Sequence, residues 1–198
     1  MSNLTKIKMR RHGCLRFILL TAVTLFVLFF ALDAGRDALL EFIYPIKYSH
    51  VVEKRCEEFG LDKYLVYAVI RTESKFKEDA LSDAGAKGLM QLMDETAKEC
   101  NEKGSFSYNI PEDILKPEVN ITLGCYYLSK LIDYYDGDIS LAITAYNGGT
   151  GNVGKWLKDS ELSDGDGGLI DIPFEETKGY VDKVLSAYDK YKEIYTEN

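Results

Sequence analysis

The feature that most limits what this chain can fold into is a run of sixteen residues without a charge, Phe17–Leu32, near the N-terminus. Its only polar members are two threonines. A membrane-spanning helix needs about 20 apolar residues, with a lower limit of roughly 17, and residues 15–34 supply that length. Residues 1–34 also carry five basic residues against one acidic residue. Because a basic flank stays on the cytoplasmic side of a membrane, we predict a cytoplasmic tail over residues 1–14 and a transmembrane anchor over residues 15–34.

A cleaved secretory signal is the alternative for this segment. Such a signal has an apolar core of roughly 7–15 residues and small residues at its cleavage site. The run here is slightly longer, and its exit places Leu32 and Ala34 at the two positions that small residues should fill. We therefore favour an uncleaved signal-anchor, followed by a linker over residues 35–47 and one folded domain over residues 48–198. In both cases the chain from about residue 36 onward is expected on the extracytoplasmic side of the cell membrane.

The rest of the chain is acidic. The 198 residues carry 24 Lys and Arg against 32 Asp and Glu, a net charge of −8, and residues 35–198 alone carry 19 against 31. Such a chain offers no basic footprint for phosphates, so we expect no nucleic acid partner. His12 and His50 are too few for a His-rich metal site, and we expect neither a metal nor another cofactor.

The four cysteines leave two arrangements open. Cys14 lies at the membrane edge, and Cys56, Cys100 and Cys125 belong to the exported part. An odd number allows one disulfide and one free thiol, with no pair singled out. Three buried thiols that pack as small apolar side chains are the alternative.

Apolar residues recur at helical spacing through most of residues 48–198, and no segment alternates with the period of a strand. Pro117 and Pro173 stand at the start of helical stretches, while Gly60 and the pair Gly148-Gly149 follow their ends. The predicted helices cover residues 48–59, 63–74, 88–100, 117–135, 139–147, 152–157 and 174–195. We therefore predict a mainly α-helical domain.

Glu73 is the candidate for acid catalysis. Val66, Val69 and Ile70 stand seven, four and three residues before it, so its carboxyl group falls on the apolar stripe of its helix, near the C-terminal end. Burial and the negative end of the helix both disfavour the ionised form. A carboxylic acid that keeps its proton near neutral pH can act as the general acid in the cleavage of a glycosidic bond. An ordinary solvated glutamate at a frayed helix end is the alternative.

Four blocks of sequence begin at or follow this glutamate. They are Glu73–Phe76, Gly85–Met93, Ala145–Gly149 and Ile172–Val181. In this order the blocks resemble the catalytic domain of the soluble-lytic-transglycosylase family, lysozyme-like enzymes that cut peptidoglycan. The resemblance covers about residues 48–195. One departure is Asp94, which stands where the family usually has proline and which can cap the turn that follows.

The resemblance implies a mainly helical, lysozyme-like fold with a long groove, and peptidoglycan glycan strands as the partner. It implies a membrane-anchored lytic transglycosylase that cleaves the β-1,4 bond between N-acetylmuramic acid and N-acetylglucosamine and leaves a 1,6-anhydro sugar. Glu73 matches the family's single catalytic acid and base. The residues that match its substrate-binding positions are Ser74, Met90, Gln91, Tyr146, Asn147, Glu176 and Tyr180. Met90 and Tyr146 also fit a purely structural role, since apolar and aromatic side chains are often only core residues.

Three other functions remain open. A lysozyme-type hydrolase would add to Glu73 a second carboxylate that assists a water molecule; the candidates are Asp79, Asp83 and Glu176. A membrane-tethered module could bind glycans, or take part in an assembly, without any chemistry. A peptidase or amidase of the cell wall would use Cys56 and His50, although no pattern in the sequence orients that pair.

Overall fold

The computed structural model describes residues 20–30, 32, 35–36 and 38–196. The chain divides into two compact units, Met1–Pro45 and Ile46–Asn198. The predicted cytoplasmic tail, residues 1–14, lies outside the described residues, as does part of the predicted anchor.

The first unit is helical over residues 20–30 and 38–43. The large apolar side chains of the first stretch are exposed, among them Leu20, Phe26 and Phe29, which are 65–66% accessible. Across the described part of the chain, no helix is long and apolar enough to cross a membrane.

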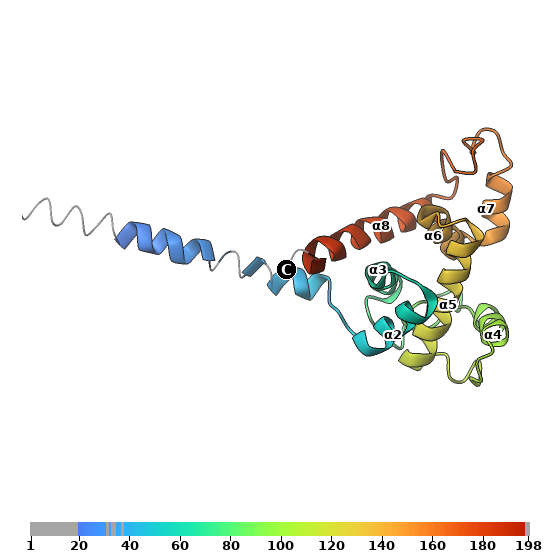
Figure 1. The fold of residues 1–198 in the computed structure, drawn as a ribbon, viewed down its shortest axis with the longest axis horizontal. Coiled ribbons are helices and arrows are strands. Elements are labelled where there is room, and N and C mark those ends of the chain that lie inside the picture. The colour runs from blue at the N-terminus through green and yellow to red at the C-terminus, as the bar shows by residue number, and fades with distance from the viewer. Residues whose placement is uncertain (1–19, 31, 33–34, 37, 197–198) are drawn as a thin grey trace, which may run out of the picture. The chain divides into compact units, whose positions relative to one another are not determined.

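The second unit is built from helices (Figure 1). Over its described residues, 46–196, these are α2 (Ser49–Phe59), α3 (Lys63–Ser74), α4 (Asp94–Lys103), α5 (Pro117–Tyr134), α6 (Ile139–Gly148), α7 (Thr150–Trp156) and α8 (Glu175–Thr196). Extended pairing is limited there to isolated bridges, such as that between Lys87 and Leu92. The prediction of a mainly α-helical domain is confirmed.

Local signals set several of the helix ends. The Asp62 side chain caps α3 by accepting a hydrogen bond from the Tyr64 backbone N–H at 2.8 Å, which satisfies one of the unpaired donors of the first turn. Asp138 caps α6 in the same way through Leu141, and Gly60 ends α2 in the left-handed conformation.

The predicted helix over residues 88–100 is wrong in its first half. Residues 88–93 form a tight non-helical turn, and α4 begins only at Asp94. Gly88 and Gln91 have φ values of 76° and 49°, which a right-handed helix does not allow. The apolar spacing of this segment therefore reflects burial in a turn, because Leu89 and Met90 are fully buried without being helical.

Helix α3 is the deeply buried element that carries the site. Residues 65–70 of α3 are at most 1% exposed. It packs along α8 and against α2, while α5 packs on α2, α4 and α6, and α6 contacts α7 and α8. Because neighbours cover α3 on all sides, the position of its C-terminal end, which carries Glu73, is fixed by the core.

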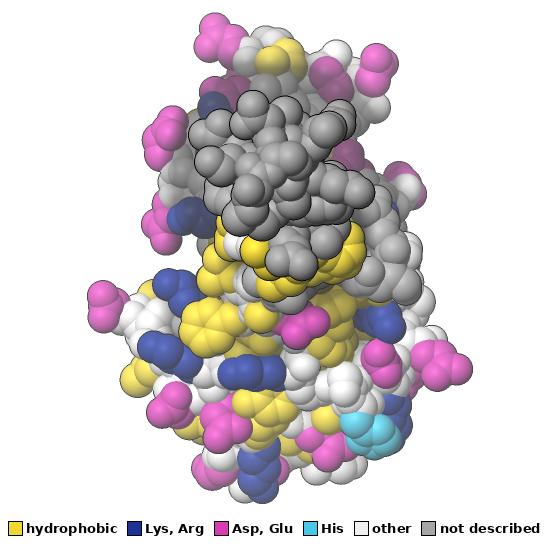
Figure 2. Space-filling model, turned by 90° about the vertical axis from the view of Figure 1, so that its left-hand side faces the viewer, with side chains coloured by type: hydrophobic (Ala, Val, Ile, Leu, Met, Phe, Trp, Pro, Cys, Tyr) yellow, Lys and Arg dark blue, Asp and Glu magenta, His cyan; other side chains and the backbone are white. Residues whose placement is uncertain are grey.

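The three cysteines of the second unit are buried, whereas its surface carries side chains of both charges (Figure 2). Cys56, Cys100 and Cys125 are each a free thiol in this structure. On the described part of the face in Figure 2, Lys and Arg side chains are scattered among Asp and Glu and form no continuous basic patch.

Candidate active site

Glu73 lies in the last turn of α3, and its carboxyl group is bonded to one tyrosine hydroxyl and within electrostatic reach of a second tyrosine. Tyr180 of α8 donates a hydrogen bond to Glu73 Oε1 at 2.7 Å. Burial raises the pKa of Glu73 from 4.5 to about 7, although the Tyr180 hydrogen bond acts in the opposite direction. The physical cause is that removal of water penalises the charged form more than one neutral donor stabilises it. The carboxyl group therefore keeps its proton close to neutral pH.

Tyr146 of α6 is the second tyrosine. Its hydroxyl donates to the Met90 backbone oxygen at 2.8 Å. Its pKa is raised well above the usual value, first by burial and then by the charge of Glu73, so the ring lies within electrostatic reach of the carboxyl group. Because the single phenolic proton points to Met90, Tyr146 presents lone pairs rather than a donor to its other neighbours.

The turn over residues 88–93 is held in place by hydrogen bonds from three other parts of the chain. The Met90 N–H donates to the Asn120 side-chain oxygen at 2.7 Å, and the Met90 oxygen accepts the Tyr146 bond described above. Ser74, adjacent to Glu73 and only 6% exposed, places its hydroxyl 2.8 Å from the Leu89 backbone oxygen. Ser74 thus ties the end of α3 to this turn.

Asn120 of α5 was missed by the sequence reasoning, although it organises the same turn. It is fully buried, and its amide nitrogen donates to the Lys87 and Ile114 backbone oxygens at 2.9 and 3.0 Å. Buried polar groups require partners, and Asn120 has three. An asparagine between the apolar Val119 and Ile121, within a predicted buried helix, is the signal that identifies it.

Two further features shape the turn. The Gln91 amide nitrogen donates to the Gly88 and Ala80 backbone oxygens at 2.9 and 3.1 Å, and its side chain remains partly exposed. Helix α5 approaches Met90 so closely at Gly124 that a Cβ there would collide with the methionine side chain. The Met90 side chain is fully buried. Met90 therefore contributes to the surface beside Glu73 only through its backbone.

Asn147 and Glu176 are exposed and come together elsewhere in the site region. They line a pocket of about 370 Å³ where the end of α6 meets the start of α8, together with Gly148, Phe174, Glu175 and Thr177. The structure therefore sorts the predicted residues into two groups. Ser74, Met90, Gln91, Tyr146 and Tyr180 surround or support Glu73, and Asn147 and Glu176 form the pocket wall.

Other groups bear on the chemistry of Glu73. Among the described residues, no second carboxylate contributes to its pKa shift, and Asp79 and Asp83 are exposed. No cluster of three or more His, Cys, Asp or Glu side chains suited to a metal occurs in the described part of the chain.

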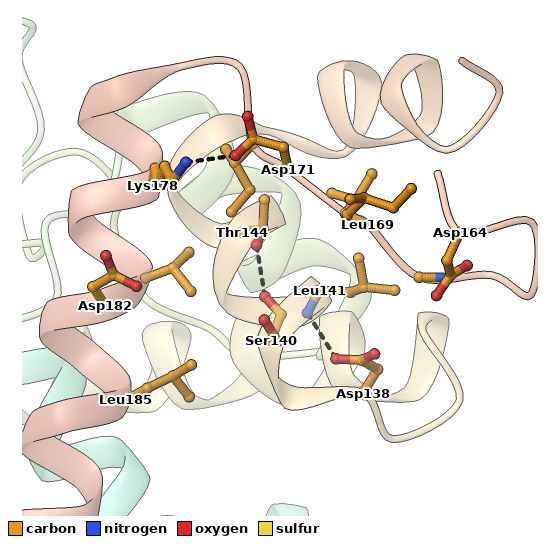
Figure 3. A pocket seen from close by; sticks show the side chains of 14 residues that line it. Asp138, Ser140, Leu141, Thr144, Asp164, Leu169, Asp171, Lys178, Asp182 and Leu185 are labelled. Atoms are coloured by element: carbon orange, nitrogen blue, oxygen red, sulfur yellow. Dashed lines mark hydrogen bonds and ion pairs between the residues drawn. The ribbon is translucent and has the colours of Figure 1, made fainter. Parts of the chain in front are cut away.

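A second cavity, of about 380 Å³, lies between α6, α8 and the loop that precedes α8 (Figure 3). Lys178 and Asp171 form an ion pair at 2.6 Å on its rim. None of the residues predicted for the site lines this cavity, so the candidate active site is the region of Glu73.

The raised pKa of Glu73 predicts how Glu73→Gln changes stability. Below pH 4.5 the carboxyl group is neutral in both the folded and the unfolded chain, so the two proteins should have equal stability. Between pH 4.5 and about 7 the unfolded chain loses the proton first, and the wild type loses up to about 3 kcal/mol of unfolding free energy. We expect the variant to be more stable at pH 8 by up to that amount, as measured by urea denaturation at pH 4 and 8. A difference that is the same at both pH values would contradict the buried neutral acid.

Tyr180→Phe removes the hydrogen bond that lowers the pKa of Glu73. We expect the pKa of Glu73 to rise further above 7, measured by NMR titration of the side-chain carboxyl carbon. Tyr188→Phe is the matched control, because the Tyr188 hydroxyl bonds to Asp62 on the same helix pair. An unchanged Glu73 titration in Tyr180→Phe would show that the hydrogen bond does not form in solution.

Comparisons with known proteins agree with this arrangement. The family model "Transglycosylase SLT domain" matches residues 50–166. A putative soluble lytic murein transglycosylase of Haemophilus influenzae is 38% identical over 151 residues, which make up 76% of this chain and 25% of that protein. Membrane-bound lytic murein transglycosylase C of Pectobacterium atrosepticum is 32% identical over 167 residues, 74% of this chain and 47% of that protein.

Solved structures show the same fold. An inactive Glu-to-Gln mutant of the lytic transglycosylase Slt from Pseudomonas aeruginosa superimposes with a TM-score of 0.71 at 38% identity, covering 78% of this chain and 25% of that one. The 70 kDa soluble lytic transglycosylase of Escherichia coli gives 0.72 at 32% identity with the same coverage. The chain thus spans about a quarter of the length of these soluble relatives. The family match over more than half of its residues shows that this chain belongs to the transglycosylase SLT domain family.

Proposed function

We propose that this protein is a peptidoglycan lytic transglycosylase that cleaves the β-1,4 bond between N-acetylmuramic acid and N-acetylglucosamine and leaves 1,6-anhydromuramic acid ends. The observation that carries the proposal is the neutral carboxyl group of Glu73, on which no second carboxylate of the described residues acts. Hydrolytic glycosidases normally need two carboxylates. A single acid fits a reaction in which the substrate supplies the other reacting groups.

The reaction proceeds in two proton transfers. Glu73 protonates the bridging oxygen as the bond to C1 of the muramic sugar breaks, and the N-acetyl carbonyl of that sugar stabilises the cationic C1. The Glu73 carboxylate then takes the proton of the C6 hydroxyl, whose oxygen closes on C1. Glu73 ends in its starting state, and no water is consumed.

In this proposal each Glu73 oxygen has its own part in the cycle. Oε1 accepts the Tyr180 hydroxyl, so Oε2 carries the proton that moves to the sugar. The Tyr180 bond also stabilises the carboxylate that exists between the two transfers, because a donor favours the charged form. Tyr180 therefore limits the rise in the pKa of Glu73 to about 7. The bond keeps the carboxylate accessible, and this carboxylate must take the proton of the C6 hydroxyl in the second transfer.

The remaining residues bind the glycan strand in this proposal. Asn147 and Glu176 contact the sugar from the pocket that they line, and Gln91 and Tyr146 orient the sugar and its acetamido group at the turn. Ser74 and Met90 act through the backbone that they hold in place. Fixed positioning of this kind contributes several kcal/mol to catalysis.

The products of peptidoglycan digestion test the proposal. The full chain is incubated with purified peptidoglycan in water labelled with ¹⁸O, and the released muropeptides are analysed by mass spectrometry. We expect anhydro ends without the label. Reducing ends that carry one ¹⁸O atom would identify a hydrolase and overturn the proposal.

We further propose that residues 15–34 anchor the protein in the cell membrane, with the domain from about residue 48 on the cell-wall side. The support is the uncharged run Phe17–Leu32, its helical residues 20–30 with exposed apolar side chains, and the membrane-bound relatives. Membrane fractions of cells should retain the protein after carbonate washing. Release into the medium, with a new N-terminus near residue 35, would identify a cleaved signal instead.

A further inference from the structure

Two cysteines from distant parts of the sequence meet in the core of the second unit. Cys56 lies on α2 and Cys125 on α5, and the two side chains are close enough that Cys56 is the main cause of a raised pKa at Cys125. Both are buried, at 6% and 0% exposure. The sequence left open which of the three exported cysteines can pair, and the packing of α2 on α5 brings these two together.

A neighbouring contact fixes the same helix pair independently. Arg55, one residue before Cys56, donates from Nε to the Thr122 hydroxyl of α5 at 2.8 Å. Its guanidinium is also ion-paired with Glu118, at 3.7 Å. One turn of α2 is therefore held against one turn of α5 at the level of the two thiols.

Cys100 is in different surroundings. It packs in a separate cluster with Leu92, Ala97 and Ile114. Its pKa is raised to about 12, first by burial and then by Glu99, with no part for another thiol. Cys100 is therefore the odd cysteine of the exported part.

We propose that Cys56 and Cys125 are a disulfide site that joins α2 to α5 when the protein folds in the presence of a thiol–disulfide oxidant. One thiolate attacks a sulfur of the oxidant and releases one of its thiols. The second cysteine then displaces the other half of the oxidant from this mixed disulfide. The protein loses two protons and two electrons, and the oxidant is reduced to two thiols.

The bond fits the proposed location and would support the active site. Disulfides persist outside the cytoplasmic membrane. Helix α5 carries Asn120 and Gly124, which shape the turn at Met90, so a bond at Cys125 secures the helix on which that turn rests. The interaction with Cys56 and burial raise the pKa of Cys125, which makes the thiolate scarce once the core has closed. The bond therefore forms during folding.

Counting thiols tests the site without any measure of activity, so the result does not depend on the proposed function. The full chain is unfolded with its four cysteines reduced and refolded with oxidised and reduced glutathione. We expect two free thiols, one Cys56–Cys125 link in peptide maps, and a melting temperature roughly 5–15 °C above that of the reduced protein. Four free thiols, glutathione bound to Cys56 or Cys125, or a link to Cys100 would overturn the proposal.

Two variants sharpen the result. Cys100→Ala should keep the link and one free thiol, with the same redox-dependent melting shift. Cys125→Ala should keep three free thiols and lose the shift. A shift that persists in Cys125→Ala would assign the effect to other cysteines, and the thiol count of the unsubstituted chain remains decisive if this variant does not fold.

Discussion

Replacing Glu73 by glutamine is expected to lower the rate of glycan-strand cleavage by about a thousandfold or more. The amide has nearly the same shape and still offers an oxygen to the Tyr180 hydroxyl, so the fold should be kept. It can neither protonate the bridging oxygen nor take up the proton of the C6 hydroxyl, and both transfers of the proposed reaction are therefore lost. The measurement is the release of muropeptides from purified peptidoglycan by the full chain.

Glu57→Gln is the matched control, since Glu57 is an exposed glutamate on a helix of the same unit. It should cleave at the wild-type rate. Turnover by Glu73→Gln within tenfold of the control would refute the assignment of Glu73 as the catalytic acid.

Replacing Asn120 by leucine should cause the second large effect, a loss of about 3 kcal/mol or more in the free energy of unfolding. The change leaves the Met90 N–H and the Ile114 carbonyl without a partner, and each unsatisfied buried group costs about 1–3 kcal/mol. The Lys87 carbonyl loses one of its two donors and keeps the Leu92 N–H. Because Met90 and Lys87 belong to the turn beside Glu73, cleavage should also fall at temperatures where the variant remains folded. Urea denaturation and the cleavage assay measure the two effects.

Asn101→Leu separates lost stability from a displaced turn. Asn101 forms a comparable pair of hydrogen bonds, but with Tyr108 in the loop after α4. This control should lose stability and keep the wild-type turnover of folded protein. Equal turnover per folded molecule in Asn120→Leu would mean that Asn120 does not position the turn for catalysis.

The helix that carries the candidate acid could be predicted because its signals are local. Asp62 is placed to cap α3, and the apolar residues that precede Glu73 recur at helical spacing, so one stretch of twelve residues specifies both the helix and its buried face. Burial of the carboxyl group follows from that face. The raised pKa follows in turn from the burial.

The turn over residues 88–93 could not be predicted in the same way. Its apolar residues have a spacing that fits a helix, so the sequence predicts a helix there. The backbone instead follows contacts with Asn120, Tyr146 and Ser74, which lie 30, 56 and 15 residues from their hydrogen-bond partners in the turn. Helix propensity depends on neighbouring residues and does not predict a conformation that is set by partners so far away in the sequence.

The amino-acid sequence by itself determined the helical character of the domain, the stripe that buries Glu73 and the blocks that carry the family resemblance. These depend on spacings within one or two turns of helix. Only the tertiary structure decided that Tyr180, 107 residues along the chain, bonds to Glu73, that Asn120 holds the Met90 turn, and that Cys56 meets Cys125. Such contacts arise when α5 and α8 pack against the earlier helices, and side-chain geometry across packed helices is set by the whole core rather than by neighbours in the chain.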